Sequence, residues 1–309
     1  MSFGERLCNK IRERGTPLIV GLDPRLERLP QACLDSDIQP GDLPAVASAF
    51  EKFCIQVIDV VAPLVPGVKP NAAFFEALGP AGMEALARVN RHARDQGLLV
   101  ILDAKRGDIG STAEAYANAF LAANNVWAAD ALTVNPFLGC DSLEPFVQVA
   151  EENQTGIFVL VKTSNPGSAD FQDLTQDGKT VSDRVAEYLQ QKNLQQTAAL
   201  DSDCRFGSLG AVVGATHPEQ IETLRQAMPN AIFLIPGVGA QGGKASDIAA
   251  AFNDQGLGAI VNSSRGIIFA YENEKYSAAS NWQAAVEQAT HKTISDLAEH
   301  TSAGVLLKT

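Results

Sequence analysis

The chain has 309 residues, 46% of them hydrophobic and 19% charged, a length that fits one large α/β barrel or two ordinary domains. Its net charge of −12 argues against nucleic acid or an anionic membrane as partner, so an anionic small molecule would need local cations. The five scattered cysteines lack Cys-x-x-Cys spacing, and the N-terminus shows no signal-peptide pattern. We therefore expect reduced thiols and a cytoplasmic protein.

The first predicted element is a short amphipathic helix at residues 3–14, with Phe3, Leu7 and Ile11 on one face. After it, short apolar runs typical of buried parallel strands alternate with longer helical patterns. The strands are expected at residues 18–23, 64–69, 98–103, 131–135, 156–163, 210–214, 232–237 and 259–264. The helices that follow them are expected at residues 43–62, 82–95, 112–124, 143–152, 180–192, 218–227, 244–252 and 282–298.

Eight strand–helix units in one run predict a (β/α)₈ barrel, forming a single domain over residues 1–309. A doubly wound sheet is the competing fold, but no Gly-x-Gly-x-x-Gly motif follows the first strand. Three loop excursions are expected, at about residues 25–42, 165–178 and 271–280. Each follows a strand, on the side where barrels keep their active sites, so each is a candidate lid, binding loop or surface decoration.

The third predicted strand carries the most informative polar residues. Asp103 and Lys105 follow an apolar run and are two residues apart, so in a strand their side chains would point the same way. Asp108 comes where the strand should give way to a loop. Residues 111–114 (Ser-Thr-Ala-Glu) predict a capping box that opens the next helix. Taken alone, Asp103 and Lys105 could equally form a structural ion pair.

Other strand ends carry polar residues as well, and in a barrel these ends converge on one face. The residues at these ends are Asp23, Lys69, Asn135 and Ser164. The loop at 236–243, with Gly237, Gly239 and Gly242, offers backbone N–H groups, and Arg265 follows the last strand. Barrels often bind phosphate at this position, although a glycine-rich loop can also be no more than a flexible turn.

The predicted site thus holds three acids and two lysines, without histidine or cysteine. Because Lys69 and Lys105 lie among the acids, we expect no metal. A Schiff-base aldolase is an alternative, but the nearby carboxylates favour protonated lysines.

At these residues the sequence resembles the orotidine 5′-phosphate decarboxylase family, in its longer bacterial form, over nearly the whole chain. Residues 103–108 (Asp-Ala-Lys-Arg-Gly-Asp) are similar to that family's Asp-x-Lys-x-x-Asp signature, and residues 67–71 (Gly-Val-Lys-Pro-Asn) supply its other lysine. Residues 21–23 and 163–167 resemble its ribose-binding and pyrimidine-binding segments. The resemblance implies conversion of orotidine 5′-phosphate to UMP and CO₂ in de novo pyrimidine synthesis, without a cofactor.

The resemblance also implies roles for single residues. Lys105 would stabilise the carbanion at C6 and donate its proton, and Thr112 would serve the ribose of a partner subunit in a homodimer. The implied catalytic residues are Lys69, Asp103, Lys105 and Asp108. The implied substrate-binding residues are Asp23, Lys69, Thr112, Ser164, Gln241 and Arg265, with Gly237, Gly239 and Gly242 in the phosphate loop.

Two alternatives are open at this point. A sugar-phosphate decarboxylase of the same superfamily resembles a Mg²⁺ enzyme and needs an acidic ligand at the end of the second strand, where Lys69 stands. A non-catalytic barrel that senses a nucleotide or sugar phosphate would need the phosphate-binding residues, but not two lysines among three acids.

Overall fold

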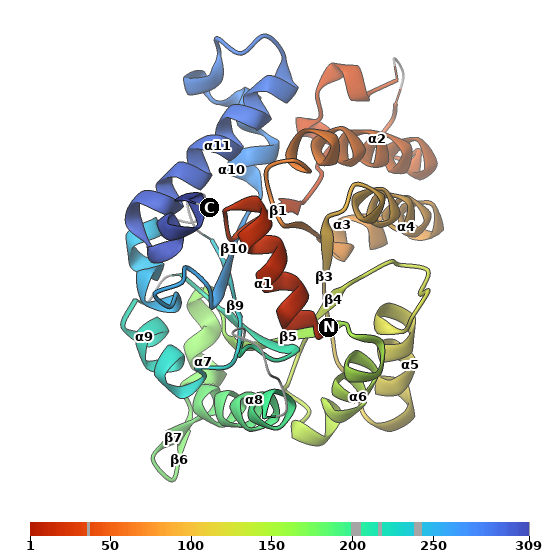
Figure 1. The fold of residues 1–309 in the computed structure, drawn as a ribbon. Coiled ribbons are helices and arrows are strands. Elements are labelled where there is room, and N and C mark those ends of the chain that lie inside the picture. The colour runs from red at the N-terminus through yellow and green to blue at the C-terminus, as the bar shows by residue number, and fades with distance from the viewer. Residues whose placement is uncertain (36–37, 199–204, 216–217, 238–242, 309) are drawn as a thin grey trace.

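The computed structural model describes residues 1–309 except 36–37, 199–204, 216–217, 238–242 and 309. Its centre is a closed barrel of parallel strands in the order β1-β10-β9-β8-β5-β4-β3-β2, with helices around it (Figure 1). The strands are β1 (Leu18–Leu22), β2 (Gly67–Pro70), β3 (Leu99–Arg106), β4 (Ala131–Val134), β5 (Gly156–Lys162), β8 (Leu209–Val213), β9 (Phe233–Pro236) and β10 (Ala259–Ser263). The predicted barrel is confirmed.

The helices lie at or near the predicted positions. The α-helices are α1 (Phe3–Arg14), α2 (Leu43–Val61), α3 (Ala72–Glu76), α4 (Gly79–Asp95), α5 (Gly110–Leu121), α6 (Glu144–Asn153), α7 (Ala169–Gln172), α8 (Val181–Thr197), α9 (Pro218–Ala227), α10 (Arg265–Ile268) and α11 (Trp282–His300). The 3₁₀ helices are η1 (Leu26–Arg28), η2 (Gln31–Cys33), η3 (Cys140–Ser142), η4 (Pro166–Ser168), η5 (Ala245–Ala251), η6 (Ala270–Glu272), η7 (Glu274–Tyr276) and η8 (Ser302–Lys308). The helix expected at 244–252 is therefore the 3₁₀ helix η5.

The barrel strands are apolar because helices cover them outside and side chains fill them inside. All five residues of β1 are buried, and Gly21 within it has no room for a side chain. A Cβ there would lie 1.8 Å from the Ser264 hydroxyl oxygen. The close approach of β1 and the segment after β10 therefore requires glycine at this position.

The N-terminal helix α1 lies across one end of the barrel (Figure 1). Its Phe3 ring meets Phe158 of β5 edge to face, with centroids 6.1 Å apart. Arg6 pairs with the buried Asp130, whose other carboxylate oxygen accepts a hydrogen bond from the Val100 backbone N–H at 2.9 Å. A helix docked at this end leaves the C-terminal ends of the strands as the open face of the barrel.

The predicted capping box at residues 111–114 is wrong. Helix α5 begins at Gly110, and the preceding Ile109 makes no side-chain capping hydrogen bond. Gly110 has a φ of +53°, a conformation that glycine adopts without cost, so the chain turns into the helix before Ser111 is reached. Ser111 and Thr112 therefore lie exposed in the first helical turn.

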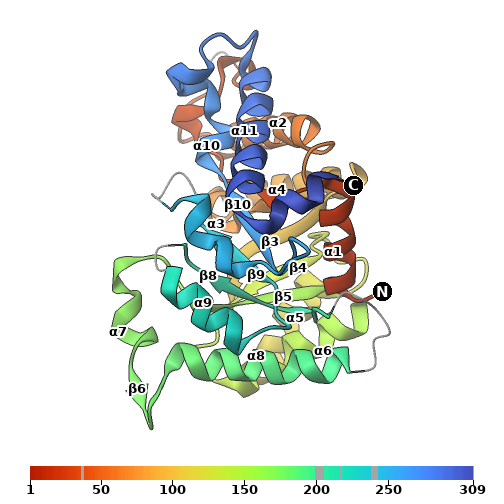
Figure 2. The same ribbon diagram turned by 60° about the vertical axis from the view of Figure 1, so that its left-hand side comes forward.

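The three excursions leave the C-terminal ends of their strands. The first and third are joined, because Arg28 of η1 forms an ion pair with Glu272 of η6 and accepts a hydrogen bond from Tyr271 through its carbonyl. The second contains η4, α7 and the small hairpin of β6 (Thr175–Gln176) and β7 (Lys179–Thr180), which projects from the barrel (Figure 2). Within the described ranges, every helix is too short or too polar to cross a membrane.

Candidate active site

A cavity of about 1120 Å³ opens at the C-terminal ends of the strands. It receives residues from all eight barrel strands or from the loops that follow them. The predicted site residues that line it are Asp23, Lys69, Asp103, Lys105, Ser164, Gly237 and Arg265. Most of the predicted site is thus brought together as barrel geometry requires.

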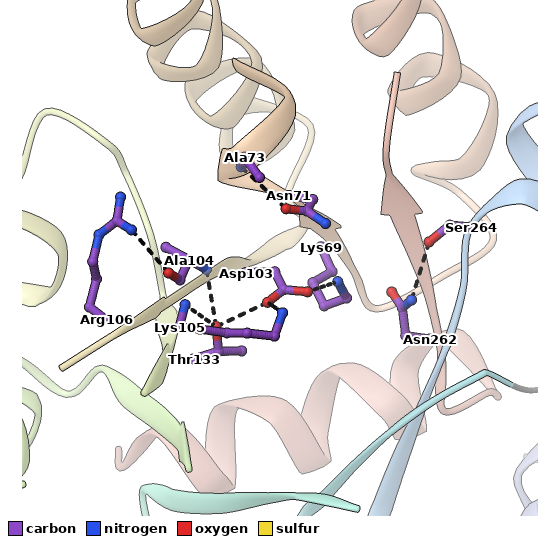
Figure 3. Close-up of polar contacts among 10 residues, drawn as sticks. All are labelled: Lys69, Asn71, Ala73, Asp103, Ala104, Lys105, Arg106, Thr133, Asn262 and Ser264. Carbon is purple, nitrogen blue, oxygen red and sulfur yellow. Dashed lines mark hydrogen bonds and ion pairs between the residues drawn. The ribbon is translucent and has the colours of Figure 1, made fainter. Parts of the chain in front are cut away.

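The centre of the site is the carboxylate of Asp103, held between two ammonium groups (Figure 3). Lys69 of the neighbouring strand β2 donates to Oδ2, and Lys105 donates to Oδ1 at 2.5 Å. The side chain of Lys69 is 5% exposed, whereas that of Lys105 is 50% exposed. Lys69 is therefore buried with its partner, while Lys105 presents its ammonium group to the cavity.

The charge state of Asp103 follows from its surroundings. Burial alone would raise the pKa of this carboxyl, but the charges of Lys69 and Lys105 and their hydrogen bonds outweigh it. The net effect holds the pKa of Asp103 well below its usual range. Two ammonium groups around one carboxylate leave a local positive charge, which suits an anionic ligand in a protein that is strongly negative overall.

The side chains of Asp103 and Lys105 do project together, as predicted, but regular strand alternation is not the reason. The register between β3 and β4 shifts between Leu102 and Arg106, and Lys105 has a φ of +46°. This left-handed conformation is strained for a residue with a side chain and costs on the order of 1–3 kcal/mol. The lysine reaches the carboxylate from a bulge, not from a regular strand.

Thr133 of β4 holds this bulge in place, and the sequence analysis missed it. Its hydroxyl oxygen accepts hydrogen bonds from the backbone N–H groups of Ala104 at 3.0 Å and Lys105 at 2.9 Å. Its own proton goes to Oδ1 of Asp103 at 3.1 Å (Figure 3). Thr133 is 1% exposed, and a threonine inside an apolar strand carries no sequence signal of such a role.

Only some of the residues predicted to bind phosphate lie within the part of the chain that the structure describes. Gly237 follows β9 with a φ of +91° and lines the cavity, as does Arg265 at the start of α10. Gly239, Gln241 and Gly242 lie outside the described residues. Gly237 and Arg265 thus bound one side of the cavity with a backbone turn and an exposed guanidinium group.

Two of the predicted site residues, Asp108 and Thr112, do not line the cavity of their own chain. Asp108 is half-buried, and its Oδ1 accepts a hydrogen bond from the next backbone N–H, that of Ile109, at 2.8 Å. Thr112 lies exposed on α5. Neither lines the cavity, so a single chain does not bring Asp108 to the lysines.

The lining also includes Asn135, predicted at the end of its strand, and Asn71 of the predicted segment 67–71. Asn71 caps α3 by accepting from the Ala73 N–H at 3.2 Å, and Asn262 donates to Ser264 at 3.2 Å. Gln172 of α7 also lines the cavity. Among the described residues, no three His, Cys, Asp or Glu side chains gather as metal ligands.

The low pKa of Asp103 predicts how acid affects stability. The ionised carboxylate stabilises the fold above the ordinary aspartate pKa of about 4, and this contribution is lost as the pH falls towards the lower folded-state pKa. In urea unfolding between pH 8 and 3, the stability difference between wild type and Asp103→Asn should be constant above about pH 5 and shrink below about pH 4. The exposed Asp254, changed to Asn, controls for removal of one negative charge. A difference that stays constant down to pH 3 would contradict the low pKa.

Comparison with known proteins places the chain in a family. A family model described as orotidine 5′-phosphate decarboxylase / HUMPS family matches residues 16–280. The chain is 54% identical to an orotidine 5′-phosphate decarboxylase of Rhodopirellula baltica, over 94% of this chain and 97% of that protein. It is 45% identical to the Deinococcus radiodurans protein of the same name, over 87% and 90% of the two chains. The structure of Leishmania donovani OMP decarboxylase matches with a TM-score of 0.74 at 30% identity, over 97% of this chain and 98% of that one. The protein therefore belongs to the orotidine 5′-phosphate decarboxylase / HUMPS family.

Proposed function

We propose that this chain converts orotidine 5′-phosphate to UMP and CO₂, with Lys105 as the proton donor and without a cofactor. The observation that carries the proposal is the Lys69–Asp103–Lys105 chain of charges, in which Lys69 and Asp103 are buried and Lys105 faces the cavity. The relatives named orotidine 5′-phosphate decarboxylase, which match over most of this chain, support the same activity.

The chemistry needs a cation at the reacting carbon. When the bond between C6 and the carboxyl carbon breaks, CO₂ leaves and the electron pair stays in the ring plane at C6, where no π system accepts it. The ammonium group of Lys105 stabilises this carbanion and then gives it a proton, which forms the C6–H bond of UMP. Lys105 is left neutral and regains a proton from solvent.

Asp103 and Lys69 have supporting roles in this scheme. The anionic Asp103 fixes the position of Lys105 and lies near the substrate carboxylate, where repulsion between like charges fades as CO₂ leaves. Lys69 keeps Asp103 ionised from within the barrel. A Mg²⁺-dependent sugar-phosphate enzyme would need a carboxylate where Lys69 stands, so this residue favours the decarboxylation of orotidine 5′-phosphate.

The remaining cavity residues fit the other parts of the nucleotide. Arg265 and Gly237 would hold the phosphate, assisted by Gly239, Gln241 and Gly242 as predicted from the sequence. Asp23 would accept from a ribose hydroxyl, and Ser164 would contact the pyrimidine ring. Binding energy from the distant phosphate would help to position the ring at Lys105.

A homodimer would explain the two predicted residues that miss their own cavity. Asp108 and Thr112 flank the exposed apolar side chain of Ile109, and Phe137 and Leu138 after β4 are exposed as well; these three apolar side chains are 58%, 76% and 50% exposed. A two-fold interface over this surface would cover the apolar side chains and carry Asp108 and Thr112 to the partner's site. We place the protein in the cytoplasm, where free cysteines remain reduced.

The decisive test is the loss of substrate absorbance when the protein is mixed with orotidine 5′-phosphate in EDTA.

Lys105→Ala should lower kcat by at least the roughly 10²–10⁴-fold typical of a lost general acid, with a far smaller effect on UMP binding. The exposed Lys52, changed to Ala, is the matched control. Near-normal kcat in Lys105→Ala would rule out this lysine as proton donor, and activity only with added Mg²⁺ would indicate the sugar-phosphate reaction.

We expect Thr133 to affect catalysis by holding the bulge that positions Lys105. Thr133→Val keeps the shape but removes the acceptor for two backbone N–H groups, so the bulge should loosen and kcat should fall about tenfold or more. Thr133→Ser retains the hydroxyl and should keep most of the activity. Steady-state kinetics of both variants check this, and equal activity of the two would show that the hydroxyl is not needed.

Sites shared between subunits can be tested by mixing two inactive variants. Asp108→Asn and Arg265→Ala chains should each be nearly inactive alone. A heterodimer of the two would hold one site with both defects and one with neither, so activity should recover towards half per heterodimer. Decarboxylase activity is measured after the purified variants have been mixed and have exchanged subunits. Exchange without recovery would mean that Asp108 serves its own subunit.

A further inference from the structure

The segment at residues 163–167, which carries Ser164, is packed between two elements. The first is Gly214, which directly follows the neighbouring strand β8. A Cβ on Gly214 would lie 2.9 Å from the Cα, Cβ and N atoms of Ser164. The Gly214 N–H also donates to the carbonyl of Lys162 at 2.8 Å. Only glycine allows Ser164 to approach β8 this closely, so this side of the segment has little room to move.

The other side is the end of helix α7 in the second excursion. The side-chain carbonyl of Gln172 accepts from the Thr163 backbone N–H at 2.9 Å, and its amide group donates to the Thr163 hydroxyl at 2.8 Å. That hydroxyl donates in turn to Oδ1 of Asn165 at 2.6 Å. The Gln172 side chain therefore makes two hydrogen bonds to Thr163, one as acceptor and one as donor. Together they fix both the backbone and the side chain of Thr163.

Two further contacts tie the same elements together. Lys162, whose side chain is 6% exposed, donates to Oδ1 of Asp173 at 2.5 Å. The Ser182 hydroxyl contacts the carbonyls of Val161 at 2.8 Å and Gln172 at 3.2 Å. A buried ammonium group is costly without its partner, so Asp173 cannot move away from β5 at low cost. The last residues of β5 are thus anchored to the end of α7.

We propose that Gln172 is a positioning residue for pyrimidine recognition, and that the second excursion acts through it as a fixed brace for the ring-binding segment. Gln172 sets the backbone of Thr163, and Ser164 is thereby held between α7 and Gly214 at one distance from the ring. The proposal rests on the proposed function, in which Ser164 contacts the ring. It assigns the brace to the ring alone, since Gly237 and Arg265 follow β9 and β10, which are not neighbours of β5 in the barrel.

The test compares two ligands that differ by the ring. Calorimetric titration measures the dissociation constants of UMP and of ribose 5-phosphate, which has the sugar and phosphate but no pyrimidine. Gln172→Ala should weaken UMP binding about tenfold and leave ribose 5-phosphate binding unchanged, because two hydrogen bonds that position the ring contact are lost. The control is Gln176→Ala on the same excursion, whose exposed side chain leaves the hairpin backbone intact.

Two more variants keep the proposal testable if Gln172→Ala folds poorly. Gln172→Glu still accepts from the Thr163 N–H and should lose less UMP affinity than Gln172→Ala. Thr163→Val removes the hydroxyl from the other partner and should again weaken only UMP. Equal losses for both ligands, or no loss for UMP, would overturn the brace. Failure of the wild-type protein to bind UMP while it binds ribose 5-phosphate would overturn the proposed function instead.

Discussion

One buried carboxylate constrains the whole active site. Asp103 is almost inaccessible to water, and an ionised group there is tolerated only because Lys69 and Lys105 both contact it. Removal of either lysine would leave a charge without its full compensation, so β2 and β3 must meet in one register at the rim of the barrel. The adjacent strands therefore serve the site as much as the fold.

The same contact explains a strained backbone. Lys105 adopts a left-handed conformation that regular strands avoid, and the buried hydroxyl of Thr133 compensates by accepting from two backbone N–H groups. The bulge turns a strand residue into one whose ammonium group faces the cavity while still touching Asp103. Strain is thus located at the residue proposed to donate the proton, where a defined position matters most.

Different loops carry the other residues proposed to bind substrate around Asp103. The segment after β5 is anchored to α7 through Gln172, whereas Arg265 follows β10 and bounds the cavity on another side. Asp108 and Thr112 do not line the cavity of their own chain. The residues proposed for the ring, the phosphate and the partner subunit are therefore separate in the chain, although the barrel brings the first two sets to one cavity.

The sequence by itself determined the barrel and most of the charged site. Apolar runs and helical patterns are local, so they revealed eight units, and Asp103 and Lys105 stood out at the end of an apolar strand. The tertiary structure decided what depends on neighbouring strands: Thr133 meets Lys105 only through the register and bulge between β3 and β4, and Gln172 meets Thr163 only when the excursion folds back. It also overturned the capping box, because a positive φ at Gly110 starts the helix early. The contacts of Thr133 and Gln172 join different secondary-structure elements, and no periodicity within one segment encodes them.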